Sequence, residues 1–103
     1  MTALIWCPFP DRGSARKVAS ALLDDRLIGC ANILGPMQSL FEWDGERGES
    51  EEFGVLFKTD GTMLDDAVQR LEQLHPYDAP AVMGWRCDAA GAATADWLGG
   101  LAK

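Results

Sequence analysis

The side chains in this sequence that could bind a soft or borderline metal ion are three cysteines and one histidine, at Cys7, Cys30, Cys87 and His75. Thiolate sulfur suits Cu(I), and imidazole suits Cu(II) and Zn(II), so Cys7 and His75, followed by Cys87, are the attractive ligands. No C-x-x-C or H-x-x-x-H pair is present. Local spacing therefore does not assemble a four-ligand site in one chain, and symmetry-related chains would have to contribute.

Each of these side chains also has a structural interpretation. A free cysteine on an apolar strand, which is where we expect Cys7, is usually buried and inert. His75 would end a helix, where its ring can stabilise the last carbonyls and the helix dipole. Cys30 stands in the segment Gly-Cys-Ala-Asn-Ile, and the packing of small residues accounts for it. Both interpretations stay open at this point.

Other classes of function are disfavoured. Cys7 and His75 could formally act as a nucleophile and its base, but the sequence offers no oxyanion motif and no third orienting group. A net charge of -7, with nine Lys and Arg, argues against nucleic-acid binding, which needs a basic face. No stretch approaches the roughly 18 apolar residues of a membrane span, and we expect no signal peptide, because the apolar run near the start of the sequence is too short. We expect one non-enzymatic domain over residues 1–103, cytoplasmic, without a disulfide framework, and with neither nucleic acid nor membrane as a partner.

The elements that must position these residues are organised around one long β-hairpin from Cys30 to Thr59. Asp44-Gly45 supplies the residues that tolerate positive φ in a tight turn. The descending arm contains the apolar run 53–57, which suits a strand buried on both faces. Each arm could run roughly ten residues or more, longer than a usual strand. The hairpin should therefore project past a small domain and pair with something.

The remaining pattern predicts two strands and three helices. Thr2 to Phe9 should form a central strand buried on both faces. A helix capped by Asp11 or Ser14 should run to Gly29, with an apolar stripe at 15, 18, 19, 22 and 23. A second helix, capped by Asp60 or Thr62, should end at His75, because Pro76 follows. Residues 81–87 should form the last strand, and residues 94–101 a short helix with three side chains buried, those of Trp97, Leu98 and Leu101.

The predicted order is α+β, β-α-β-β-α-β with a helical tail, which is the ferredoxin-like split βαβ arrangement. Right-handed crossovers would place both main helices on one face of the sheet. The other face would be bare, with Trp6, Trp43 and Trp85 on strands that could line it. Exposed aromatic side chains on a sheet are costly in water, so we expect the chain to associate through that face or through the hairpin edges.

Four short motifs in this order resemble the CutA divalent-cation-tolerance family. They are Cys30-Ala31-Asn32-Ile33, Ser39 to Gly45 (SLFEWDG), Glu52 with Lys58-Thr59, and His75-Pro76-Tyr77 with Pro80. The resemblance covers nearly the whole chain. It implies a ferredoxin-like homotrimer, similar in architecture to the PII signalling proteins, whose long hairpins wrap neighbouring subunits. It also implies a link to copper or another divalent metal, which folding does not require.

The same resemblance assigns residues. It places Cys7 and His75 at positions implicated in metal binding, and it implies clefts between subunits lined by Cys30, Asn32, Phe41, Trp43, Glu52, Lys58 and Tyr77. The sequence departs from the family pattern twice. Phe41 stands where the family usually has Tyr, and Ala81 stands where Glu is common. Both departures remove a polar group.

Two functions are compatible with these residues. The first is a homotrimer that binds divalent metal ions, with copper first, and acts in metal tolerance or response. The alternative is a PII-like signalling or scaffold trimer, in which the clefts between subunits bind a small anion or a partner protein. In that case Lys58 and Arg47 would matter more than Cys7.

Overall fold

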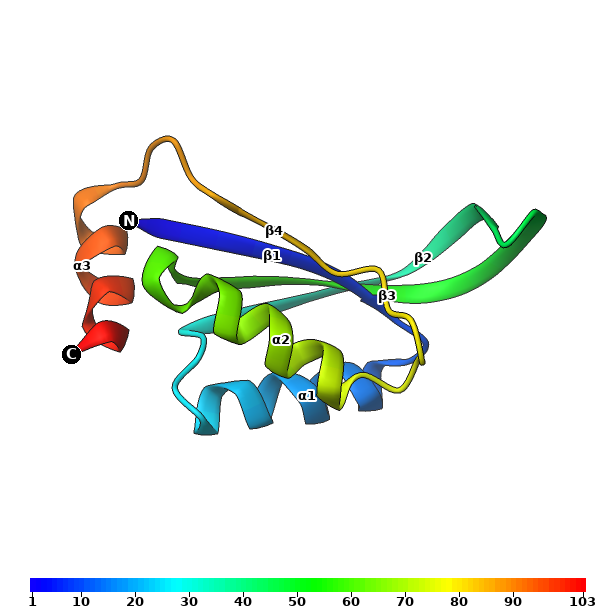
Figure 1. Cartoon of the computed structure of the whole chain (residues 1–103), viewed down its shortest axis with the longest axis horizontal. Helices are drawn as coiled ribbons and strands as arrows, with labels where there is room; N and C mark the ends of the chain where they lie inside the picture. The colour runs from blue at the N-terminus through cyan, green and yellow to red at the C-terminus, as the bar shows by residue number, and fades with distance from the viewer.

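A four-stranded antiparallel sheet with the strand order β2-β3-β1-β4 forms the centre of the computed structural model, which describes residues 1–103. Its strands are β1 (Thr2–Phe9), β2 (Cys30–Trp43), β3 (Glu46–Asp60) and β4 (Met83–Arg86). Two helices, α1 (Arg12–Asp24) and α2 (Leu64–Leu74), cover one face, and α3 (Ala92–Gly99) closes the end of the sheet near the N-terminus (Figure 1). The predicted ferredoxin-like order with a long β2-β3 hairpin and a helical tail is confirmed.

The hairpin forms where the sequence predicts it. Asp44 and Gly45 have φ angles of 54° and 79°, and Trp43 faces Glu46 across the turn. Both central residues are left-handed, as a two-residue turn matching the strand twist requires. A register shift separates Leu34 from Met37, and Gly35, with φ 144°, lies inside it. Beyond this irregularity the hairpin projects past the body of the molecule (Figure 1).

The core lies between the sheet and the two main helices. Alternate residues of β1 face the helices and are fully buried, as are two apolar residues of β3; they are Ala3, Ile5, Cys7, Phe9, Val55 and Phe57. The residues between them, such as Leu4, Trp6 and Leu56, are only half-buried. The prediction that β1 and the 53–57 run are buried on both faces is therefore wrong, because no helix of the chain covers the second face.

Helix caps follow the sequence more closely than helix ends do. Asp11 caps α1 and accepts a hydrogen bond from the Ser14 N–H at 2.7 Å. Asp60 accepts one from the Thr62 N–H at 3.1 Å and caps a 3₁₀ turn, Gly61–Met63, that precedes α2. The prediction that Asp60 or Thr62 caps α2 itself is wrong, because α2 follows Met63, which makes no side-chain cap. The predicted extension of α1 to Gly29 is wrong, because the helix ends at Asp24 and Arg26 adopts a left-handed φ of 59°.

The last strand and the tail differ from the prediction. β4 pairs with Ala3–Trp6 of β1 and is only four residues long. Continuing the ladder would set Ala81 opposite Pro8, which has no N–H to donate. In the tail, Leu98 is fully buried and Leu101 is half-buried, but Trp97 is 51% exposed, so its predicted burial is wrong. A short amphipathic helix buries one stripe, and Leu98 occupies it.

The uncovered face of the sheet carries two of the three expected tryptophans. Trp6 lies over Gly54, and Trp85 pairs with Leu4 on the same side. Trp43 lies farther out, at the end of β2, and lines a pocket described below. We call the side of the sheet opposite α1 and α2 the open face. None of the helices is long and apolar enough to cross a membrane.

Candidate functional site

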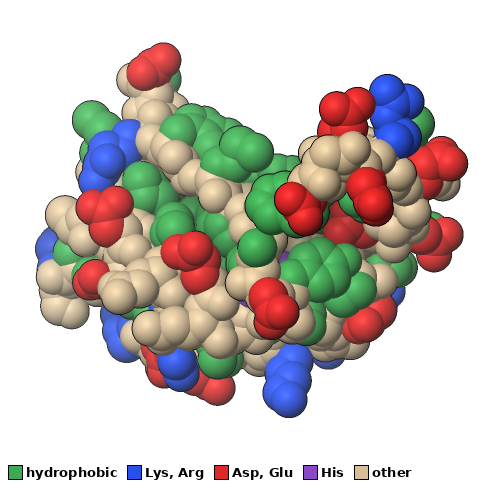
Figure 2. Space-filling view, turned by 45° about the vertical axis from the view of Figure 1, so that its right-hand side comes forward, with side chains coloured by type: hydrophobic (Ala, Val, Ile, Leu, Met, Phe, Trp, Pro, Cys, Tyr) green, Lys and Arg blue, Asp and Glu red, His purple; other side chains and the backbone are tan.

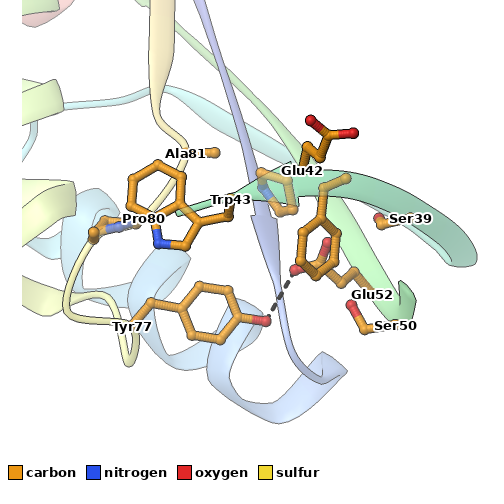
Figure 3. Close-up of a pocket in the computed structure, with 11 residues that line it drawn as sticks. Ser39, Glu42, Trp43, Ser50, Glu52, Tyr77, Pro80 and Ala81 are labelled. Carbon is orange, nitrogen blue, oxygen red and sulfur yellow. Dashed lines mark hydrogen bonds between the residues drawn. The ribbon is translucent and has the colours of Figure 1, made fainter. Parts of the chain in front are cut away.

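A pocket of about 550 Å³ lies where the hairpin leaves the body of the sheet. One wall comes from β2 and β3, and the other from the segment that follows α2. In Figure 3 the indole of Trp43 lies between the 77–81 segment and the hairpin, while Ser39 and Ser50 extend from the hairpin strands. The lining residues are Pro8, Ser39, Phe41, Glu42, Trp43, Ser50, Glu52, Tyr77, Ala79, Pro80 and Ala81. The pocket therefore joins three parts of the chain that are far apart in sequence.

A carboxylate lies at the base of this pocket. Glu52 is only 8% exposed, and its Oε2 accepts a hydrogen bond from the Tyr77 hydroxyl at 2.9 Å (Figure 3). Burial, together with the hydrogen bond to Glu52 and that residue's negative charge, raises the pKa of Tyr77 to about 12. The phenol therefore stays protonated at neutral pH and remains the donor. No Lys or Arg forms an ion pair with Glu52, because the ion pairs of the chain lie elsewhere.

His75 lies behind this pair and is fully engaged by the backbone. Its Nε2 donates to the Pro8 carbonyl at 2.8 Å, and its Nδ1 accepts from the Tyr77 N–H at 3.0 Å. The ring also stacks on Phe9, with centroids 4.4 Å apart. Burial lowers the pKa of His75, and the Pro8 carbonyl and the Glu52 charge oppose that shift. The imidazole is therefore neutral in this arrangement, and neither nitrogen has a free lone pair.

Cys7 lies on the helix-facing side of β1 and is fully buried. Burial, with a smaller contribution from the Glu52 charge, raises the pKa of its thiol to about 12. A metal site needs thiolate, and this environment favours the neutral thiol. The chain holds no group of three His, Cys, Asp or Glu side chains arranged around a metal ion. As they stand in one chain, Cys7 and His75 do not fit a copper site, and metal ligation by this pair stays a prediction.

The residues expected at clefts between subunits fall into two groups. Phe41, Trp43, Glu52 and Tyr77 line the pocket together. Cys30, Asn32 and Lys58 lie toward the other end of the hairpin. Cys30 pairs with Lys58, and its Sγ lies 3.7 Å from the Asn32 Oδ1. Arg47 lies outside both groups and pairs weakly with the exposed Glu42 at 3.5 Å.

The sequence interpretation missed several pocket residues, among them Pro8, Ser39 and Ser50. A signal for the two serines was available. The two-residue turn at Asp44-Gly45 fixes the register, so that the residue numbers of paired positions sum to 89 near the tip, and Ser39 pairs with Ser50. Both departures from the family pattern, Phe41 and Ala81, line the same pocket. Pro8 carried no comparable signal, since its place depends on the end of β1 meeting the 77–81 segment.

Comparisons with known proteins agree with this architecture. Residues 3–100 match the family model described as CutA1 divalent ion tolerance protein. A divalent-cation tolerance protein CutA from Pyrococcus horikoshii is 39% identical over 80 residues, which cover 78% of each chain. The solved divalent cation tolerance protein of Thermus thermophilus superposes with a TM-score of 0.88 and 31% identity, covering 95% of each chain. That of Ehrlichia chaffeensis superposes with a TM-score of 0.91 and 25% identity, covering 99% of this chain and 95% of the other. The fold, its long hairpin and these matches show that the chain belongs to the CutA1 divalent ion tolerance protein family.

Proposed function

We propose that this protein acts in the tolerance of divalent metal ions as a homotrimer without enzymatic activity, and that copper is the first ion to test. The observation that supports this most directly is the match to the CutA1 family over residues 3–100. Relatives from Pyrococcus horikoshii and Thermus thermophilus, at 39% and 31% identity, bear the name of divalent-cation tolerance proteins. The three free cysteines suit a reducing compartment, and we therefore propose a cytoplasmic location.

The uncovered side of the sheet supports assembly. Large apolar side chains on the strands are well exposed, with Leu34 at 51%, Met83 at 60% and Trp85 at 46%. Figure 2 shows hydrophobic side chains gathered beside the hollow next to the hairpin, with Asp and Glu side chains over the hairpin itself. Contiguous apolar surface of this kind on a small protein favours association with another surface. Copies of the same chain, joined through the open face and the hairpins, would cover it.

The structure constrains how such a trimer would hold copper. Cys7 is a buried thiol, and both nitrogens of His75 are hydrogen-bonded, so copper would be held by groups that assembly brings together. The small-anion alternative gains no support at the pocket, because its charged lining residues are Glu42 and Glu52. Lys58 and Arg47, which that alternative needs, lie outside it. A scaffold role that depends on a partner protein would show as a trimer without metal uptake.

Native mass spectrometry of the purified, tag-free protein, with and without copper and zinc salts, tests this proposal. We expect a trimer that takes up copper in a fixed ratio. Cys7→Ser and His75→Ala test the two ligands implied by the family, and Cys87→Ser tests the third candidate ligand. Loss of copper from an intact Cys7→Ser or His75→Ala trimer would assign ligation to that residue. A monomer at micromolar concentration, or a trimer that takes up no copper, would refute the proposed function.

A further inference from the structure

Glu52 is a buried carboxylate without a cation. It is more than nine-tenths buried, and the Tyr77 hydroxyl is the only hydrogen-bond donor within its reach. Its second oxygen, Oε1, accepts no hydrogen bond from the chain. Oε1 is not sealed from solvent, because Thr2 Oγ1 is the only buried side-chain nitrogen or oxygen atom left without a partner. The free lone pairs of Glu52 therefore lie where a donor that enters the pocket can reach them.

Three aromatic side chains line the same pocket as this carboxylate, and all three are partly exposed. Phe41, Trp43 and Tyr77 line the pocket with exposures of 44%, 67% and 38%. In Figure 3 the Tyr77 hydroxyl points at the Glu52 carboxylate, and the Trp43 indole lies beside Pro80. Aromatic faces attract cations through their quadrupole, and groups of such rings recognise ammonium ligands. Small apolar residues, Ala79, Pro80 and Ala81, complete the wall and leave room for a carbon skeleton.

We propose that this pocket binds a small organic ammonium ion, whose N–H groups donate to Glu52 Oε1 while the rings of Phe41, Trp43 and Tyr77 surround its charge. The volume of about 550 Å³ suits a small molecule. Ser39 and Ser50, which are paired across the hairpin, supply further hydrogen-bonding groups on the same wall.

Other ligand classes fit less well. An anion would meet Glu42 and Glu52 with no Lys or Arg among the lining residues. A bare divalent cation would find one buried carboxylate and aromatic rings, and no third His, Cys, Asp or Glu ligand is in place. The aromatic rings and the buried carboxylate together favour an organic cation as the ligand. This proposal does not depend on copper binding, so each can fail separately.

Titration of the assembled, full-length protein with benzylammonium chloride in the presence of EDTA tests the proposal. Calorimetry would measure binding, and the indole N–H signals of the four tryptophans would report which ring is affected. Glu52→Gln removes the charge while keeping the shape, and Trp43→Ala removes one ring at an exposed position. Glu49→Gln, on the exposed side of the same strand, is the matched control. Benzyl alcohol is the neutral probe of the same shape, and benzyltrimethylammonium is the cation without N–H groups.

We expect benzylammonium to bind and to shift the Trp43 indole signal. Glu52→Gln should weaken it by about tenfold or more, the usual effect of losing one charge-assisted hydrogen bond. Trp43→Ala should weaken it by about fivefold, as for one cation–π contact, and Glu49→Gln should leave it unchanged. Equal binding of benzyl alcohol, or of benzylammonium to Glu52→Gln, would overturn the proposal. Equally tight binding of benzyltrimethylammonium would also overturn it. So would a failure of benzylammonium to bind the wild-type assembly, which would mean that a neighbouring chain fills the pocket.

Discussion

The hydrogen bond from Tyr77 to Glu52 makes a strong prediction about stability. Replacing Tyr77 by Phe removes the only donor to a carboxylate that is 8% exposed, while the ring that lies 4.9 Å from His75 is kept. Leaving a buried charged acceptor without its donor costs about 2 kcal/mol. For a chain of this size that corresponds to a fall in thermal midpoint of roughly 8–16 °C. The apolar contacts of the ring should contribute nothing to this loss.

Urea unfolding followed by circular dichroism, at one fixed protein concentration, would measure the effect. The control is the same substitution in a Glu52→Gln background, where the side chain is no longer charged. There Tyr77→Phe should cost less than about 1 kcal/mol, the worth of a neutral hydrogen bond. The double-mutant cycle isolates the pairwise energy, because Phe and Gln preserve shape. A coupling energy below about 0.5 kcal/mol would mean that water, and not Tyr77, solvates the carboxylate, and the electrostatic reasoning for this pocket would be refuted.

Three further predictions test the core around the site. Gly54→Ala should destabilise the fold by about 1–3 kcal/mol, because its Cβ would come within 2.1 Å of the Trp6 ring; Gly99→Ala, with no atom within 4 Å, is the control in urea unfolding. Burial lowers the pKa of His75 from its ordinary 6.5, so the unfolded chain binds more protons and stability should fall as pH drops below 6.5. A pH series of unfolding free energies should show this loss in the wild type and a smaller one in His75→Gln. Because the pKa of Cys7 is about 12, iodoacetamide at pH 8 should alkylate the other two cysteines first, and rapid labelling of Cys7 in the peptide map would contradict its burial.

Much of the architecture could be read from local sequence signals. Asp44-Gly45 fixed the turn and the register of the hairpin, and Asp11 and Asp60 marked the starts of the segments that they cap. The ends of elements were less predictable. Whether β4 extends to Ala81 depends on the residue across from it, and that residue is Pro8. The prediction that Trp97 is buried failed for a similar reason. Only the packing of α3 against the sheet decides which side of the helix is covered.

The candidate site shows the same division. Sequence motifs pointed to Phe41, Trp43, Glu52 and Tyr77, and these side chains do line one pocket. The motifs did not show that Cys30, Asn32 and Lys58 lie elsewhere, because a strand fifteen residues long carries its two ends far apart. They also could not show that His75 uses both ring nitrogens on backbone groups. Those contacts depend on how α2 lies against the end of β1.

By itself the sequence determined which segments become strands and helices, how the hairpin pairs, and to which family the chain is similar. These properties follow from periodicity, turn residues and short motifs, all of which act over a few neighbouring positions. Only the tertiary structure decided that a carboxylate from β3 and a phenol from the 77–81 segment meet in one pocket, and that Cys7 is a buried thiol. The physical reason is that desolvation and charge pairing depend on every element packed around a group, and no local pattern contains that information.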